Sequence, residues 1–204
     1  MSVDDIYEHV RQLIIDQRFA EAEALLRDAR DRGFGSEHEL GLLDLLVEVY
    51  SLREPPELSK ADAVCLERER LAKTAYSMLQ TAMLRHWRAH DYVQSVLKAR
   101  EAIAAGRRED DDSTVYSALA LLGLGLIELG NDDAVKDVID EIEQMISRRK
   151  RIIIGDETTL LERARTRGLN VSTIRRIANR LAPNCRDPEF SKRLNALAAE
   201  NWSE

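Results

Sequence analysis

The chain has 204 residues, of which 44% are hydrophobic and 33% charged, and a formal net charge of −7, as is ordinary for a globular protein. Its two cysteines, Cys65 and Cys185, have no CxxC or Cys/His spacing, which argues against a disulfide framework or a structural zinc site. The first residues are acidic and no apolar run approaches the ~18 residues that span a bilayer, so we expect a cytoplasmic protein without a membrane segment.

Helix formers dominate the chain, and nine Gly and four Pro leave few breakers, so the sequence predicts an all-α fold. Apolar residues recur at helical spacing between short breaks, which is typical of helical hairpins. The stretch from residue 59 to 90 contains no Gly or Pro and is predicted to continue as one long helix. The predicted helices up to residue 150 are 3–17, 19–33, 37–54, 59–90, 91–106, 113–130 and 131–150.

After residue 150 the pattern changes. The stretch "RIIIGDET", residues 151–158, is the only one that favours a strand: it has a β-branched run followed by a turn signal, and Asp156 is a candidate cap for the next helix. Helices are predicted over 157–167, 170–182 and 187–202. The sequence therefore predicts two parts: a helical-repeat domain over residues 1–149 and a small basic helical subdomain over 150–204, which acts either as a cap or as a DNA-binding unit.

Charge is distributed unevenly along the chain. The segment from Arg148 to Arg186 has eleven Lys or Arg and three acids, a local charge of +8, so the remainder carries −15. Such asymmetry is a hint of contact with nucleic acid or with an acidic partner. The alternative is that the basic end docks on the protein's own acidic body.

Three predicted hairpin junctions resemble one another and resemble the tetratricopeptide repeat. In that family a residue at the turn, usually aromatic, is followed by small or apolar residues on the second helix, which allow two helices to pack closely. The matching residues are Phe19, Ala22, Leu26 and Ala29; Tyr92, Ser95, Ala99 and Ala102; and Gly130, Asn131, Val135, Ile139 and Ile142, with Asp132 in place of the aromatic, preceded by the family's Leu-Gly pair at Leu122 and Gly123.

The resemblance covers roughly residues 3–149, and its junctions lie 73 and 40 residues apart, so the repeats are degenerate. It implies antiparallel helical hairpins stacked as a tetratricopeptide-like solenoid, in which the first helices line a groove. It also implies that the protein is a non-catalytic adapter that binds another protein or peptide. The groove residues that this register predicts are Tyr7, Arg11, Gln80, Leu84, Trp87 and Arg88.

The helix predicted over residues 113–129 is apolar on nearly every side, and so large an apolar surface needs cover. Three kinds of cover are open: the chain's own C-terminal helices, a second copy of the chain, or an amphipathic helix of a partner. We favour cover by the chain itself, because the last repeat of a solenoid is usually capped.

The basic segment also resembles two DNA-binding motifs over residues 150–181. "ARTRGLNVSTIRRIAN" is similar to the helix-turn-helix of bacterial repressors, and the preceding "RIIIG" gives the whole segment the order of a ribbon-helix-helix protein. Either resemblance implies a nucleic-acid-binding regulator, the alternative to the adapter. The residues that would contact nucleic acid are Arg149, Lys150, Arg151, Thr173, Arg175, Arg176, Asn179 and Arg180.

Catalytic or metal-binding patterns are lacking in the sequence. His86 and His90 are four residues apart, a spacing that suits two metal ligands, but no third ligand accompanies them. There is no glycine-rich phosphate loop, nucleophile elbow or paired His and Asp set. We therefore expect no enzyme activity, no metal and no cofactor.

Overall fold

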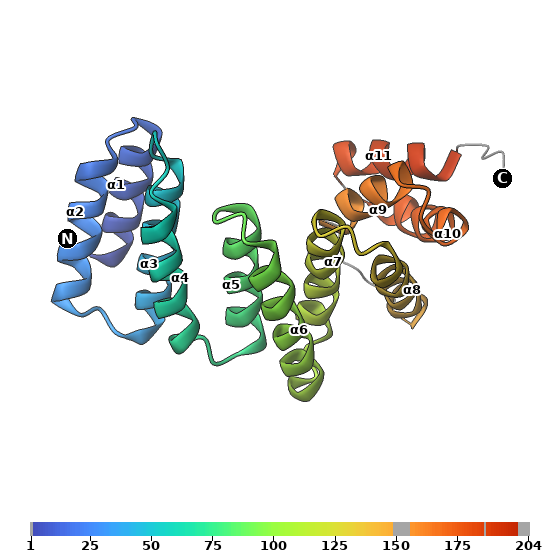
Figure 1. Ribbon diagram of the computed structural model, residues 1–204, viewed down its shortest axis with the longest axis horizontal. Coiled ribbons are helices and arrows are strands. Elements are labelled where there is room, and N and C mark those ends of the chain that lie inside the picture. Colours follow the sequence, from blue (N-terminus) through green and yellow to red (C-terminus); the bar gives the residue numbers. More distant parts are fainter. Residues whose placement is uncertain (1, 149–155, 186, 200–204) are drawn as a thin grey trace. The chain divides into compact units, whose positions relative to one another are not determined.

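The computed structural model describes residues 2–148, 156–185 and 187–199, and within these ranges it contains eleven α-helices, one short 3₁₀ helix and no strand (Figure 1). Neighbouring helices pack against one another, so the predicted all-α, helical-repeat-like fold is confirmed. The helices are α1 (Val3–Ile15), α2 (Phe19–Arg32), α3 (Ser36–Leu52), α4 (Leu58–Leu71), α5 (Ala75–Trp87), α6 (Tyr92–Glu109), α7 (Asp112–Glu128), α8 (Asp132–Arg148), α9 (Asp156–Thr166), α10 (Val171–Leu181), η1 (Ala182–Asn184) and α11 (Pro188–Ala199).

The β-branched run expected to form a strand, residues 151–154, lies outside the described residues and stays a prediction. The helix expected after it, with Asp156 at its start, is α9. The predicted domain boundary at residue 149 also falls outside the described ranges and stays a prediction.

Local capping signals set several helix ends. The Ser2 hydroxyl accepts a hydrogen bond from the Asp5 amide at 3.2 Å, and the Asp5 carboxylate accepts one from the Ser2 amide at 2.8 Å, which starts α1. Asp111 starts α7 by accepting from the Thr114 amide at 3.1 Å. Gly33 ends α2 with a φ of 70°, a conformation that glycine adopts without strain.

The predicted single helix over residues 59–90 is wrong, because the chain forms two helices there, α4 and α5. Thr74 provides the reason. Its hydroxyl accepts a hydrogen bond from the Ser77 amide at 3.2 Å, and the Ser77 hydroxyl accepts one from the Thr74 amide at 3.0 Å. This reciprocal arrangement is a capping box with Ser in place of the usual Glu or Gln, and it starts a helix without Gly or Pro.

The chain divides into two compact units. The N-terminal unit comprises Met1–Lys73 and Met83–Asp91, and the C-terminal unit comprises Thr74–Ala82 and Tyr92–Glu204. Helix α5 contributes its first turns to the C-terminal unit and its last turn to the N-terminal unit. Each unit has an apolar core of its own.

In the N-terminal unit, α1 packs against α2 and α3 against α4, and both α1 and α2 contact α3 (Figure 1). Two arginines are buried in this unit. Arg68 of α4 is 0% exposed and pairs with Asp44 of α3, and Arg85 of α5 is 1% exposed and pairs with Glu69 of α4 at 3.0 Å. The helices of this unit are therefore joined by buried charge as well as by apolar contact.

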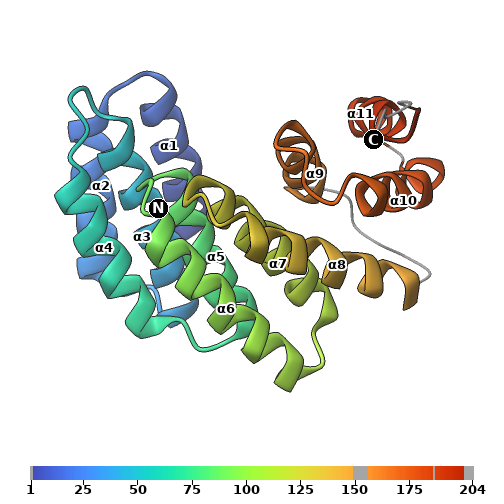
Figure 2. The same ribbon diagram turned by 45° about the vertical axis from the view of Figure 1, so that its right-hand side comes forward.

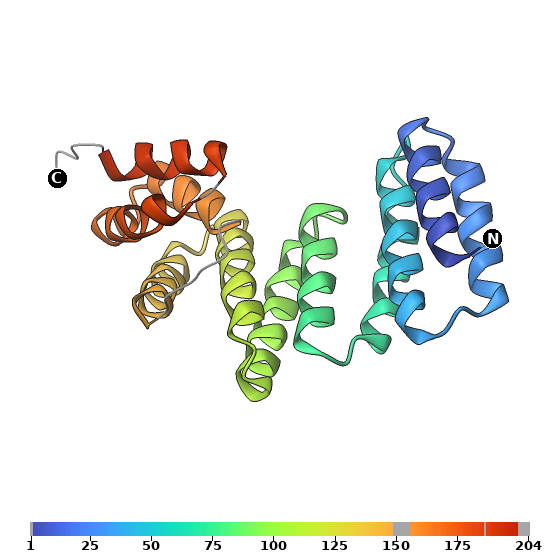
Figure 3. The ribbon, with the colours of Figure 1, turned by 180° about the vertical axis from the view of Figure 1, so that it is seen from behind.

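The centre of the C-terminal unit is α7, which is buried from Ala118 to Ile127. Helices α6 and α8 lie beside it in Figure 2, and α9 packs against it as well. Helix α10 packs on α8 and α9, and α11 packs on α9 and α10, as the orange and red helices of Figure 3 show. The apolar helix that needed cover is thus covered by helices of its own chain.

Within the described ranges, no helix combines the length and the apolarity needed to cross a bilayer.

Candidate interaction surfaces

Two residues of the predicted groove lie on α1 in different surroundings. The Tyr7 hydroxyl donates to the carbonyl of His38 at 2.9 Å and lies 2.5 Å from the point that a Cβ at Gly41 would occupy. Burial raises the pKa of Tyr7. The side chain of Arg11 is 65% exposed, and Glu8 lies 3.9 Å from its guanidinium. Tyr7 therefore packs α1 against α3, whereas Arg11 is open to a partner.

The other predicted groove residues lie on α5 and just after it. Leu84 packs on the core of the N-terminal unit, and Arg88 donates to the Glu48 carboxylate at 2.9 Å. Trp87 keeps 38% of its surface exposed. Gln80 is half-buried and belongs to the C-terminal unit. Leu84, Trp87 and Arg88 are thus neighbours in the N-terminal unit, and Trp87 offers an accessible apolar surface there.

A row of polar contacts joins α10, and the turn before it, to α8. Its residues follow the same order on both segments, so α8 and α10 run parallel, and partners lie 30–35 residues apart in the chain. The contacts are Arg167 with Asp132 (2.5 Å), Asn170 with the Lys136 carbonyl and Asp140 (3.0 Å each), Thr173 with Asp140 (3.3 Å), Arg176 with Glu143 (2.5 and 3.0 Å), and Arg180 with the Ser147 carbonyl (3.0 Å).

Three arginines of the basic segment pair with acids of the preceding hairpin: Arg163 of α9 pairs with Glu128 of α7, and Arg167 and Arg176 pair with acids of α8. At these three positions the basic end docks on the protein's own acidic body, as one of the two hypotheses from the charge distribution expects. Positive charge that is neutralised within the chain contributes little to phosphate binding.

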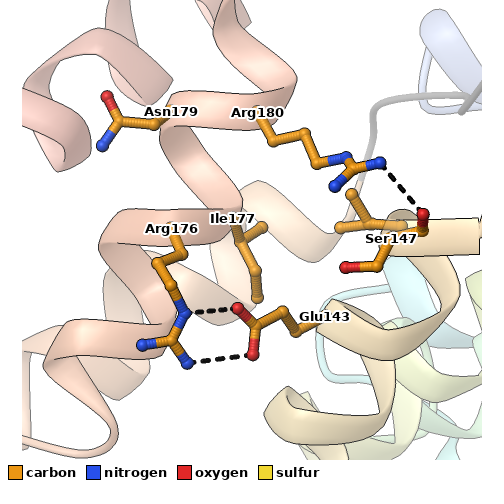
Figure 4. A pocket seen from close by; sticks show the side chains of 7 residues that line it. Glu143, Ser147, Arg176, Ile177, Asn179 and Arg180 are labelled. Carbon is orange, nitrogen blue, oxygen red and sulfur yellow. Dashed lines mark hydrogen bonds and ion pairs between the residues drawn. The ribbon is translucent and has the colours of Figure 1, made fainter.

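An open cavity of about 450 Å³ lies between α8 and α10 (Figure 4). Ile146 and Ile177, each 1% exposed, contribute its apolar lining. The polar lining residues are Glu143, Ser147, Arg176, Asn179 and Arg180. The cavity brings together three of the residues predicted to contact nucleic acid, Arg176, Asn179 and Arg180, and adds a carboxylate to them.

The arginines of α10 differ in how their charge is balanced. Arg176 forms a two-bond ion pair with Glu143, and this hydrogen bond lowers the pKa of the Glu143 carboxyl. Arg180 donates to a backbone carbonyl and forms no ion pair with a carboxylate of the described residues. Arg175 is exposed. Thr173, in contrast, is buried against α8, so it is closed to a large ligand.

The remaining predicted residues, Arg149, Lys150 and Arg151, lie outside the described residues. Among the described residues, no three His, Cys, Asp or Glu side chains gather in a group that could hold a metal ion.

Comparison with models of known protein families finds no match for this chain, and comparison with functionally characterised proteins finds none either.

Sequence reasoning missed the partners on α8, and a signal for them exists. Asp140, Glu143 and Ser147 are three or four residues apart, which places them on one face of α8. Thr173, Arg176 and Arg180 have the same spacing on α10. Two helices with matched stripes of polar residues are candidates for side-by-side packing.

Proposed function

We propose that this chain is a degenerate, tetratricopeptide-like repeat protein that acts as a non-catalytic adapter and binds another protein. The observation that carries the proposal is the parallel packing of α10 on α8, through contacts whose partners lie 30–35 residues apart. Contacts at this separation between equivalent helices are typical of stacked hairpin repeats, and such folds present extended binding surfaces.

The Leu-Gly pair supports the same proposal. A Cβ added at Gly123 of α7 would lie 2.6 Å from the Leu160 side chain of α9, so only glycine lets these two first helices approach as they do. The small residues of α6 that the repeat pattern picks out, Ser95, Ala99 and Ala102, are all buried. The burial of these residues and the close approach at Gly123 support the helix packing that the repeat pattern predicts.

The burial of α7 bears on which partner to seek. Because α6, α8 and α9 cover this helix, it gives no reason to invoke a second copy of the chain or an inserted partner helix. We propose instead that partners use accessible surfaces of the two units, at Arg11 and Trp87 on one and beside α10 on the other. The cytoplasm remains the proposed compartment, on the sequence grounds given above.

Affinity purification from cells that express the protein tests this function. The wild type is compared with Arg11→Glu/Trp87→Ala and with Arg175→Glu/Arg180→Glu, after circular dichroism has shown that all three are equally helical. We expect the wild type to retain a protein partner that at least one variant loses. Identical sets of proteins on all three would rule out binding at these surfaces.

Binding of duplex DNA, titrated with salt, tests the alternative of a nucleic-acid-binding regulator. Phosphate contacts make affinity fall steeply with salt. We expect weak binding that Arg175→Glu/Arg180→Glu does not change. Tight, salt-dependent binding that this variant abolishes would replace the adapter with the regulator.

A further inference from the structure

We propose that the cavity between α8 and α10 is a docking site for a protein segment in which an aliphatic side chain is flanked by acidic residues. The inference rests on the proposed function and specifies the chemistry of the partner. It is carried by three features of the cavity: its apolar floor, the unbalanced positive charge at its rim, and the carboxylate in its wall.

The floor selects for an apolar group. Ile146 of α8 and Ile177 of α10 line the cavity but are each only 1% exposed, so its accessible apolar lining comes mainly from the aliphatic carbons of the polar residues beside them. The volume of about 450 Å³ is open rather than filled by side chains of the described residues. An aliphatic side chain placed there would remove apolar surface from water on both sides of the contact.

The rim selects for negative charge. A guanidinium carries five N–H donors, and Arg180 uses one of them in its hydrogen bond to the uncharged carbonyl of Ser147. The Asn179 side chain lines the same cavity and is exposed, so it offers amide donors beside Arg180. Arg175, four residues before Asn179, is exposed as well. A carboxylate at this edge would gain charge-assisted hydrogen bonds.

The charge balance around Glu143 favours a peptide over a nucleic acid as the ligand of this cavity. Glu143 lines the cavity, and its ion pair with Arg176 balances that arginine's charge, so the pair has no net charge to attract a phosphate. A nucleic-acid backbone needs a continuous track of cations, whereas Arg163, Arg167 and Arg176 are occupied by acids of the chain. A peptide with one apolar anchor and a nearby carboxylate matches the cavity without such a track.

Titrations followed by NMR test the proposal with defined probes. The probes are synthetic pentapeptides with Leu, Ile, Val or Met between two acidic residues on each side, the same peptides with a central Gly, and a 20-base-pair DNA duplex. Full-length wild type is compared with Arg180→Glu and with Lys192→Glu, which makes the same charge change at an exposed residue of α11.

We expect at least one aliphatic peptide to shift the amide signals of Ile146, Ser147, Ile177 and Arg180. The central-Gly peptides should bind about tenfold more weakly, as the loss of one buried aliphatic side chain implies. Arg180→Glu should weaken binding by about tenfold or more, because it removes a charge-assisted contact and adds repulsion, and Lys192→Glu should retain wild-type affinity.

Three results would overturn the docking site: no aliphatic peptide shifts these signals, Arg180→Glu binds as well as the wild type, or the duplex shifts them and the peptides do not. Failure here is distinct from failure of the adapter function. In the latter case the affinity purification yields no protein partner at all, whereas failure of the docking site alone leaves a partner whose retention does not depend on Arg180.

Discussion

The buried arginines of the N-terminal unit and the surface arginines of α10 in the C-terminal unit differ in what their charge does. In the N-terminal unit, Arg68 and Arg85 are buried and pair with carboxylates of neighbouring helices. In the C-terminal unit, Arg176 and Arg180 of α10 lie at the surface, where Arg176 pairs with Glu143 of α8 and Arg180 donates to the Ser147 carbonyl. Buried pairs are strongly coupled to folding, whereas exposed pairs contribute little and are weakened by salt. The comparison indicates that the buried arginines Arg68 and Arg85 stabilise the first unit, whereas surface charge on α10 remains available for binding in the second.

The largest expected effect tests the buried charge. The substitution Arg68→Met leaves the Asp44 carboxylate without this partner, in a site where burial already raises the pKa of Asp44. Breaking such a pair costs about 3 kcal/mol of unfolding free energy. Urea denaturation with amide hydrogen exchange of α3 and α4 measures the loss, and Arg70→Met, at an exposed residue of the same helix, is the control. Equal stability of both variants would show that Arg68 is not structural.

The second effect concerns close packing in the C-terminal unit. In Gly123→Ala the new methyl group meets Leu160, and overpacking costs about 1–3 kcal/mol, more than the ~1 kcal/mol that alanine gains in a helix. The substitution should therefore destabilise the wild type. In a Leu160→Ala background the clash is gone, and the same substitution should stabilise. Thermal unfolding of the four proteins tests this reversal of sign, and the same sign in both backgrounds would contradict the contact.

A smaller effect is expected at the surface pair of the C-terminal unit. Arg176→Gln removes the partner of Glu143, and the loss of stability should be below that at Gly123, since the Arg176 side chain is 58% exposed and the pair is screened by solvent. The hydrogen bond from Arg176 lowers the Glu143 pKa, so the pair stabilises the fold above the ordinary pKa of Glu, about 4.3, and this contribution disappears as pH falls through the lowered value. Denaturation of both proteins at pH 7 and pH 3 should show a larger difference at pH 7 than at pH 3.

The smallest effect on stability is expected at Arg180, whose contact is a single bond to the Ser147 carbonyl. Arg180→Gln should change the unfolding free energy by no more than about 0.5 kcal/mol, as most surface substitutions do. Thermal unfolding measures it. A loss comparable to that of Arg68→Met would place Arg180 among the structural arginines and remove the basis for a binding role.

Helical periodicity was sufficient to predict the all-α fold, because apolar spacing and scarce breakers are properties of the sequence alone. The break between α4 and α5 was not predicted, because Thr74 and Ser77 act through side-chain hydrogen bonds in a pattern that differs from the usual capping box. The sequence also predicted that other helices of the chain would cover α7, because so apolar a helix must be buried.

The candidate site was predicted in part. Arg176, Asn179 and Arg180 stood out as a cluster of polar residues on one helix, and all three line the cavity. Their sequence could not show which of them has a partner, because the partners lie 33 residues away on α8. Whether a surface arginine is docked or available depends on the packing of two helices, and it is therefore a property of the fold rather than of the local motif.

We propose that Arg176 stabilises the packing of α10 on α8 and that Arg180 binds the peptide. These two roles are tested most directly by measuring stability and peptide affinity together in Arg176→Gln and Arg180→Gln. Both substitutions remove one positive charge from the same cavity. We predict that Arg176→Gln lowers the unfolding temperature more than Arg180→Gln does, whereas Arg180→Gln causes the greater loss of affinity for the acidic aliphatic peptides. Equal effects of the two variants on both quantities would contradict the claim that Arg176 stabilises the fold and Arg180 binds the partner.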